Sequence, residues 1–199
     1  MRRYFTADLH LGSSRVLELC KRPFLDNIEM TDKLIKNCNE IAREPDDVIY
    51  HIGDLYCLRD DTGRPGMMLP WRETQKRFTA NVVNIQGNHD STNGVKSLAT
   101  SMRLVLGKAF NVVLCHYPST DRRSHIHLKP GDINICGHCH ELWNGEKFLV
   151  DKANKVLNIN VCTDLWDYQP VSEVTLVNYI KQILSSHLPI LGNRLGETT

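Results

Sequence analysis

The chain has 199 residues, of which 41% are hydrophobic and 24% charged, and this ordinary globular composition argues against a disordered protein. That length suffices for one domain with a real core and leaves no room for two full domains. The formal net charge of +1 excludes a bulk electrostatic attraction to nucleic acids or membranes, so any preference for a polyanion must come from a local patch.

The amino-terminal segment MRRYFTADLH is too short, and too soon interrupted by Asp8, for a secretory signal peptide. No later run reaches the length of a transmembrane helix. The seven cysteines are odd in number and scattered, which is typical of free thiols in a reducing compartment. We therefore expect a cytoplasmic protein without a membrane partner, in a bacterial cell or a phage-infected host.

The first half of the chain alternates short β-prone runs with helical patterns. Apolar residues recur at near-helical spacing before Pro45, and β-prone runs end abruptly in polar residues. The expected elements are a strand at 4–7, a helix at 26–44, a strand at 48–52, a loop at 57–70, a helix at about 71–79 and a strand at 82–86.

The second half keeps this rhythm but is richer in strands. The expected elements are strands at 110–115, 132–136, 156–161 and 174–177 and a closing helix at 179–187. No linker interrupts the chain, so we expect a single domain over residues 1–191 with a flexible tail at 192–199. Strands that alternate with helices in the first half of the chain, followed by several strands in succession, predict a layered α/β sandwich.

Five of the β-prone runs end in polar residues able to bind a metal or assist catalysis. In open α/β sheets, sites form outside the carboxyl ends of strands, so five strand ends can deliver these groups to one place. The clusters, in chain order, are Asp8 with His10, Asp54, Asn88 with His89 and Asp90, His116, and His138 with His140.

Carboxylates, one amide oxygen and several imidazoles, without thiolates, suit borderline or harder divalent ions. We favour manganese, with iron, zinc, nickel and cobalt as alternatives. Seven such residues exceed what one ion needs, whereas two ions sharing Asp54 would use the whole set. Two ions about 3.5–4 Å apart clamp the attacking and leaving oxygens of a phosphoryl centre.

The spacing of the candidate ligands is consistent with this site. Asp8 and His10, like His138 and His140, are two residues apart, and such residues project to the same side of an extended chain. A glycine precedes three of the clusters, where a side chain would crowd a sharp turn or the metal. These glycines are Gly53, Gly87 and Gly137.

The segments ADLHLG, HIGDLY, QGNHDS, LCHYP and CGHCHE occur in this order from Asp8 to His140, and with them the chain resembles the calcineurin-like metallophosphoesterase superfamily. The segments KRPF and NINVCTDLWDYQPVS resemble a compact bacterial and phage subgroup. The resemblance implies a four-layer α/β/β/α sandwich with two mixed sheets flanked by helices.

The resemblance also implies roles at matching positions. One metal would be held by Asp8, His10, Asp54 and His140. The other would be held by Asp54, Asn88, His116 and His138. His89 would protonate the leaving oxygen or stabilise the phosphate, oriented by Asp90. The chain departs from close relatives at Ser13, where they often carry a histidine, so no substrate contact is inferred there.

Two alternative readings concern the segment Cys136–His140. It matches the c-type haem pattern Cys-x-x-Cys-His, but haem attachment of that kind usually requires export, and no signal peptide is expected. A zinc ribbon would need a second Cys-x-x-Cys segment, which the sequence lacks.

Two loops carry basic residues that offer substrate contacts. Arg122 and Arg123 follow His116 and would hold a non-reacting phosphate oxygen, although a merely solvated loop is equally consistent with the sequence. Arg59 lies in the loop 57–70, which is either a substrate lid or plain surface. Trp166 and Tyr168 could stack on a base, but a core role is expected.

We therefore predict a metal-dependent phosphoester hydrolase, with a small nucleotide or cyclic nucleotide as the first choice of substrate. A phosphomonoesterase, including a protein phosphatase, is the close alternative. A nuclease ranks lower because no dedicated nucleic-acid platform is evident. A binding scaffold that has lost catalysis is the rival from another class, although every motif position is filled.

Overall fold

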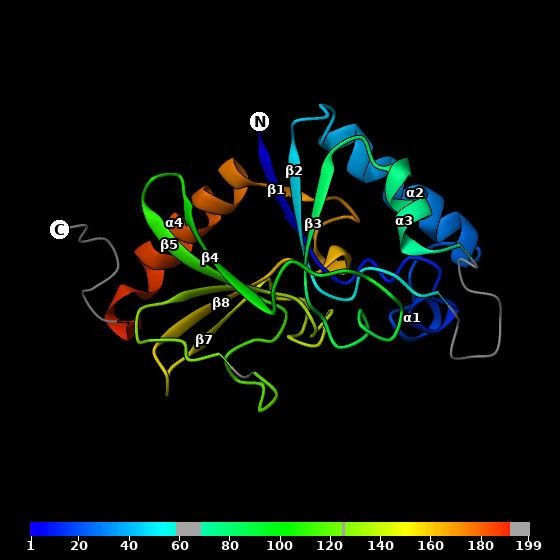
Figure 1. Cartoon of the computed structure of the whole chain (residues 1–199). Coiled ribbons are helices and arrows are strands. Elements are labelled where there is room, and N and C mark those ends of the chain that lie inside the picture. The colour runs from blue at the N-terminus through cyan, green and yellow to red at the C-terminus, as the bar shows by residue number, and fades with distance from the viewer. Residues whose placement is uncertain (59–68, 125, 192–199) are drawn as a thin grey trace.

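The computed structural model describes residues 1–58, 69–124 and 126–191, and Figure 1 shows them arranged around two β-sheets. The first sheet has the order β3-β2-β1-β9. Its strands β1, β2 and β3 are parallel and β9 is antiparallel to β1. Their bounds are Arg3–Thr6 for β1, Val48–Ile52 for β2, Asn81–Ile85 for β3 and Val171–Ser172 for β9.

The second sheet has the order β4-β5-β6-β8-β7. Its three central strands are parallel, and both edge strands run antiparallel to their neighbours. The bounds are Ser101–Leu106 for β4, Phe110–Cys115 for β5, Ile133–Cys136 for β6, Phe148–Asp151 for β7 and Val156–Asn160 for β8. Both sheets are mixed and flanked by helices, so the predicted α/β fold class is confirmed.

The helices are α1 (Ser14–Leu19), α2 (Asn27–Ile41), α3 (Trp71–Thr74) and α4 (Glu173–Leu191). Two 3-10 turns span Gln75–Arg77, directly after α3, and Thr163–Leu165. Asp26 caps α2, because its side chain accepts hydrogen bonds from the amides of Ile28 and Glu29. None of the helices within the described residues combines the length and apolar character that crossing a membrane requires.

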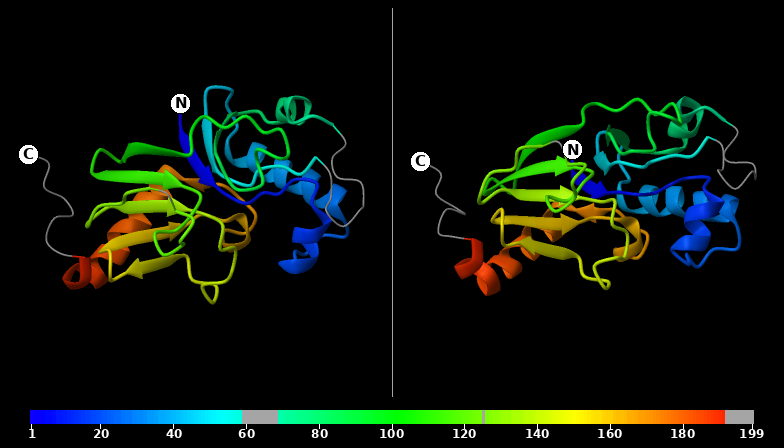
Figure 2. Two further views of the ribbon diagram at one scale, coloured as in Figure 1. Left: turned by 60° about the horizontal axis from the view of Figure 1, so that its bottom comes forward. Right: turned by 90° about the horizontal axis from the view of Figure 1, so that it is seen from below.

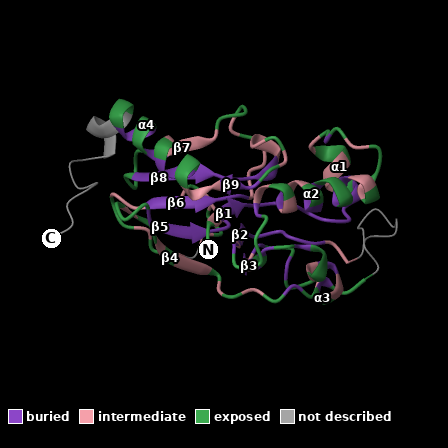
Figure 3. Cartoon of the chain, turned by 90° about the horizontal axis from the view of Figure 1, so that it is seen from above, coloured by how far each residue is buried: buried purple, intermediate pink, exposed green. Residues whose placement is uncertain are grey.

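Alternation of side chains along the first sheet produces two apolar layers. Tyr4, Ile49 and Val82 belong to a buried cluster with Met30 and Leu34 of α2. On the other face, residues such as Phe5 and Ile52 join a cluster built from the second sheet and α4. Figure 3 shows that the strands are mostly buried while the helices expose one side. The first sheet is thus held between α2 and the second sheet.

The structure corrects one predicted element and adds four helices or strands. Residues 174–177, predicted as a strand, belong to the first turns of α4. Helix α1 and strands β4, β7 and β9 were not predicted. The predicted tail at 192–199 and residues 59–68 of the predicted loop lie outside the described residues.

The carboxyl ends of the parallel strands of both sheets point toward the same region, as the two views of Figure 2 allow the reader to follow. Two backbone hydrogen bonds join the two sheets at these ends: the amide of Ala7 donates to the carbonyl of Val161 at 3.0 Å, and the amide of Thr163 donates to the carbonyl of Ala7 at 3.0 Å. The polar clusters of the sequence therefore meet where the two sheets adjoin.

Candidate metal centre

The residues that follow β1 turn through left-handed backbone. Asp8 has a φ of 56° and His10 of 45°, and their amides donate to the carbonyls of Gly53 and Asp54 at 3.0 Å. Left-handed backbone costs a non-glycine residue about 1–2 kcal/mol, and such residues cluster at functional sites. The expected extended chain is wrong here, because a turn aims both side chains.

The segment after β6 has the same geometry. His138 has a φ of 68° and His140 of 43°, so the extended chain predicted there is wrong as well. The amide of His138 donates to Oδ2 of Asp8 at 2.9 Å, which joins the two turns across the sheets. Asp54, after β2, also lies in the left-handed region with a φ of 59°.

The first cluster joins Asp8, His10 and His140, whose potential ligand atoms lie within 4.8 Å of one another. Nε2 of His10 is 3.9 Å and Nε2 of His140 is 3.8 Å from Oδ1 of Asp8. This oxygen is buried and has no hydrogen-bond partner among the described residues. An unpaired buried carboxylate oxygen is costly unless a cation completes it, so these residues fit a metal ion.

The second cluster joins Asp54, His116 and His138, again within 4.8 Å. Nε2 of His116 lies 3.3 Å from Oδ2 of Asp54, 3.2 Å from Oδ1 of Asn88 and 3.2 Å from Nδ1 of His138. One imidazole nitrogen thus faces a carboxylate, an amide oxygen and a second imidazole, which is a donor set for a divalent ion.

Oδ2 of Asp54 lies close to a histidine of each cluster. It lies 3.3 Å from Nε2 of His116 in the second cluster and 3.7 Å from Nε2 of His10 in the first. This oxygen therefore lies between the two clusters. The two clusters are consistent with a dinuclear site.

Glycines allow the turns to approach the clustered side chains. A Cβ on Gly87 would lie 2.2 Å from Oδ1 of Asp54, and one on Gly137 would lie 2.2 Å from Oδ2 of Asp8. A Cβ on Gly53 would lie 2.3 Å from a nitrogen of the neighbouring histidine ring. The expectation that side chains would crowd these turns is confirmed, and the atoms they would meet are those of the candidate ligands.

Burial and charge move the pKa values of the histidines in opposite directions. Burial and the charge of His116 lower the pKa of His138 to about 4, and burial lowers that of His10 well below its ordinary value. Burial also opposes the charging of His116, but its hydrogen bond to Asp54 and the charge of Asp8 raise its pKa to about 9. Two imidazoles are thus neutral at pH 7, the state that metal ligation needs.

His89 stands beside the clusters and belongs to neither. Its ring lies edge-on to that of His10, with the ring centroids 5.5 Å apart. Its amide donates to Oδ1 of Asp54 at 2.9 Å, while the residue itself is exposed and lines the cavity. An imidazole in this position is accessible to a substrate.

Asp90 does not orient His89, and that prediction is wrong. Its buried carboxylate accepts hydrogen bonds from the amides of Gly87 at 2.7 Å, Leu55 at 2.9 Å and Asp54 at 3.1 Å. The side-chain amide of Asn84 donates to it at 2.9 Å. Among the described contacts none joins this carboxylate to the ring of His89. Because both oxygens are occupied, Asp90 fixes the turn of Asp54 instead.

Of the arginines predicted to contact substrate, Arg123 lies at the site. Its guanidinium donates to Nε2 of His138, pairs with Asp121 through two hydrogen bonds at 3.0 and 2.8 Å, and lies 5.2 Å from the ring centre of Tyr117. Arg122 is exposed and does not line the cavity beside the clusters. Arg59 lies outside the described residues.

A cavity of about 680 Å³ opens beside both clusters. His10, Asp54, Asn88, His89 and both histidines of the Gly-His-Cys-His segment line one part of it. Helix α1 and the segment after β2 line the rest, with Arg15, Val16, Leu19, Tyr56 and Leu58 among the lining residues. The cavity thus has a polar part at the clusters and a mixed remainder, in which Val16, Leu19 and Leu58 form an apolar portion.

Arg22 and Asp164 lie directly behind the first cluster, yet neither received a role from the sequence. They form an ion pair with Nε of Arg22 2.7 Å from Oδ1 of Asp164, and Asp164 also contacts His140 at 2.8 Å. The only signal for them was their place in the segments KRPF and NINVCTDLWDYQPVS. Trp166, expected in the core, packs against the hydrophobic core between the second sheet and α4, and its indole nitrogen donates a hydrogen bond to the carbonyl of Asn160 at 2.9 Å.

Over residues 1–168 the chain matches the family model of the calcineurin-like phosphoesterase superfamily domain. It belongs to this superfamily. The two His/Asp clusters contain residues of four of the five sequence motifs, and Asn88 of the remaining motif lies 3.2 Å from Nε2 of His116. Cys136, in contrast, is fully buried in β6, and its thiol contacts the carbonyl of Ile159, so the haem alternative finds no support.

The chain is also similar to individual proteins and solved structures. MJ1445 of Methanocaldococcus jannaschii is 27% identical over 179 residues, which cover 90% of this chain and 91% of that relative. The crystal structure of AQ665, a protein of unknown function from Aquifex aeolicus, has a TM-score of 0.61 and 18% identity over 89% of this chain and 98% of that one. Yfce, a phosphoesterase from E. coli, has a TM-score of 0.43 and 18% identity, covering 80% and 78% of the respective chains.

Proposed function

We propose that this chain is a two-metal-dependent phosphoester hydrolase that prefers diesters, with a small nucleotide or cyclic nucleotide as substrate. The observation that carries the proposal is the position of Oδ2 of Asp54 between two histidine-containing clusters. A single carboxylate oxygen shared by two donor sets is what two adjacent ions need from a bridging ligand.

The proposed ligands divide as the clusters do. The first ion would be held by Asp8, His10, His140 and Asp54. The second ion would be held by Asp54, Asn88, His116 and His138. Bound ions of this kind polarise the phosphoryl oxygens and lower the pKa of water. Manganese remains the first choice, with iron, zinc, nickel or cobalt as alternatives.

His89 is proposed as the proton donor. In the reaction, a phosphorus–oxygen bond to the leaving group breaks while the oxygen of water forms a new bond to phosphorus. The leaving oxygen needs a proton, and the imidazole of His89 is exposed and lies edge-on to the ring of His10. The hydrogen bond from its backbone amide to the side chain of Asp54 keeps the backbone of His89 beside the reacting centre.

The cavity supports a diester substrate. Beyond the polar groups, Val16, Leu19 and Leu58 offer an apolar wall where a second ester group of nucleoside size can lie. The alternative, a phosphomonoesterase, draws its support from Arg123, because the guanidinium beside His138 can pair with the additional charged oxygen of a monoester.

The test compares hydrolysis of bis-p-nitrophenyl phosphate with that of p-nitrophenyl phosphate after metal removal and stepwise addition of manganese. We expect metal-dependent hydrolysis, a larger kcat/KM for the diester and about two ions per chain by elemental analysis. Faster monoester hydrolysis would favour the alternative. No activity with any divalent ion would contradict the proposal and leave a binding scaffold as the explanation.

A further inference from the structure

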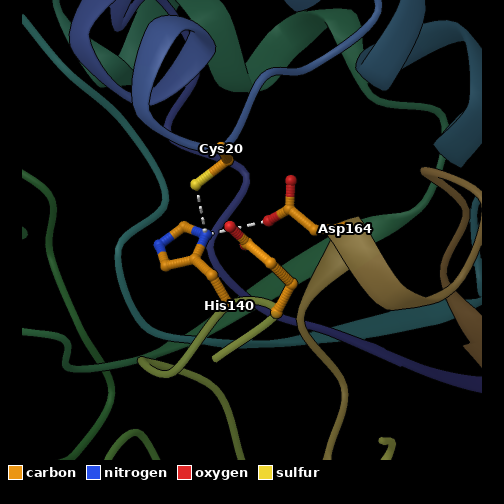
Figure 4. A group of neighbouring side chains, drawn as sticks. Cys20, His140 and Asp164 are labelled. Carbon is orange, nitrogen blue, oxygen red and sulfur yellow. Dashed lines mark hydrogen bonds and ion pairs between the residues drawn. The ribbon is translucent and has the colours of Figure 1, made fainter. Parts of the chain in front are cut away.

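The imidazole of His140 is contacted from both of its nitrogens. Nε2 lies 3.8 Å from Oδ1 of Asp8, whereas Nδ1 lies 2.8 Å from Oδ2 of Asp164. Figure 4 shows Asp164 and Cys20 approaching this second nitrogen. Asp164 belongs to the 3-10 turn Thr163–Leu165 that follows β8, so a different strand end positions this ring from behind.

Asp164 is itself held by a buried arginine. Nε of Arg22 donates to Oδ1 at 2.7 Å and Nη2 donates to Oδ2 at 2.9 Å. The side chain of Arg22 is 0% exposed and that of Asp164 is 5% exposed. Such a forked, buried pair allows the carboxylate little freedom to rotate.

The same guanidinium also holds the turn that follows β1. Nη2 donates to the carbonyl of Asp8 at 2.7 Å and Nη1 donates to that of Leu9 at 2.9 Å. These carbonyls belong to the left-handed turn that carries Asp8 and His10. One buried cation therefore links the turn with two candidate ligands to the carboxylate behind a third.

The cost of this arrangement points to a role beyond folding. Burying an arginine and a carboxylate removes both charges from water, and a well-packed apolar pair is often equally or more stabilising. A carboxylate that accepts the Nδ1 proton of a histidine leaves the Nε2 lone pair directed outward and fixes the ring. In this site, that lone pair faces Asp8.

Two thiols surround the same nitrogen and suggest another use of the cluster. Sγ of Cys20 lies 3.4 Å and Sγ of Cys162 lies 3.7 Å from Nδ1 of His140. Cys20 and His140, with Glu141 and Asp164, form a group that could bind an ion of its own. Arg22 argues against this use, because its positive charge already occupies both oxygens of Asp164 and would repel a cation.

We propose that Asp164 and Arg22 are positioning residues for the first metal ion. Asp164 fixes the orientation and tautomer of His140, and Arg22 fixes both Asp164 and the turn of Asp8 and His10. This inference rests on the ligand sets given under the proposed function.

The test is titration calorimetry of manganese into metal-free protein, with wild type and Asp164→Asn compared. Wild type is expected to bind two ions. The isosteric variant should lose about 10- to 100-fold in affinity for one ion and keep its affinity for the other. The ion whose binding is weakened should be the same ion whose binding is lost in His10→Ala. Arg22→Lys, which keeps the charge but not the fork, should weaken the same step less.

Asp132→Asn is the matched control, because Asp132 pairs with Arg103 through two hydrogen bonds at 3.2 and 2.9 Å next to the first residue of β6, away from the cavity. It should change neither step. Unchanged binding by Asp164→Asn would overturn the inference alone, as would equal weakening of both steps, which indicates a merely structural role. Failure of wild type to bind any ion would instead overturn the proposed function and the inference with it.

Cobalt separates the positioning role from a thiol-bound ion. Cobalt-loaded wild type should lack a thiolate-to-metal charge-transfer band, and Cys20→Ser should have the same spectrum. A band in the wild type that disappears in Cys20→Ser would assign the cluster behind His140 to a metal ion of its own and overturn the proposal.

Discussion

At the scale of single residues, Asp8 shows how the site favours ligand binding over stability. Its carboxylate is fully buried, and Oδ1 has no hydrogen-bond partner among the described residues. Burial accordingly raises the pKa of Asp8 above its usual range. An oxygen kept unpaired at this cost is available to a cation, and such groups explain why activity and stability often oppose one another.

His89 offers the clearest test of chemistry separate from metal binding. We expect His89→Ala to lower kcat by about 10²- to 10⁴-fold, because the leaving oxygen loses its proton donor, while both ions remain bound. Steady-state kinetics and elemental analysis on the same preparation measure both quantities. His127→Ala, an exposed histidine away from this cavity, is the control. An unchanged kcat in His89→Ala would remove this residue from the reaction.

At the scale of elements, the turn after β3 depends on close backbone approach. A Cβ on Gly87 would lie 2.3 Å from the backbone nitrogen of Asp54, which cannot move as a flexible side chain could. We therefore expect Gly87→Ala to displace Asp54 and to abolish binding of both ions, as measured by calorimetry.

Gly94→Ala separates this clash from general strain. Gly94 has a φ of 71°, but a Cβ there would meet nothing within 4 Å. It should cost about 1 kcal/mol of unfolding free energy, measured by urea denaturation, and leave ion binding unchanged. Full ion binding by Gly87→Ala would show that the turn can relax.

Elements with a strong local pattern could be predicted from the sequence. Strands β2 and β5 were predicted with the bounds that the structure has, because mainly apolar, β-prone runs end close to a polar candidate ligand. Residues 174–177 were misassigned because a short β-prone run of Val, Thr and Leu cannot be distinguished locally from one turn of a buried helix. Helix α1 was missed because it has only six residues and is mostly exposed.

Residues of the candidate site could be predicted where they belong to a local sequence motif. Residues that contact each other only in the folded chain could not be predicted in this way. Asp54 and His116 were identified because each ends a strand beside recognisable neighbours. Arg22 and Asp164 are 142 residues apart, so no local pattern joins them. Asp90 was given the wrong partner because adjacency in sequence suggested His89, whereas the buried amides around it compete more effectively for its oxygens.

At the scale of the whole molecule, the candidate ligands come from both sheets, so bound ions would connect them. A ligand that binds only the folded state stabilises it by about 2.7 kcal/mol at 100 times its Kd. For a chain of this size we expect saturating manganese to raise the Tm of metal-free protein by about 5–10 °C per ion at that excess.

Differential scanning fluorimetry with and without EDTA measures this shift. Asp54→Asn should abolish most of it, because Asp54 is proposed to contact both ions, whereas Asp132→Asn should leave it intact. A Tm that does not respond to any divalent ion would show that the clusters do not bind metal in the folded protein.

The left-handed backbone at Asp8, His10, Asp54, His138 and His140 has a consequence for protein engineering. An ideal designed strand cannot present these side chains in the same way, because regular strands have negative φ throughout. Transplanting the centre would therefore require the strained turns and their glycines to be carried over together with the ligands. The transferable unit is the set of strand-end turns, and a list of side chains alone does not define it.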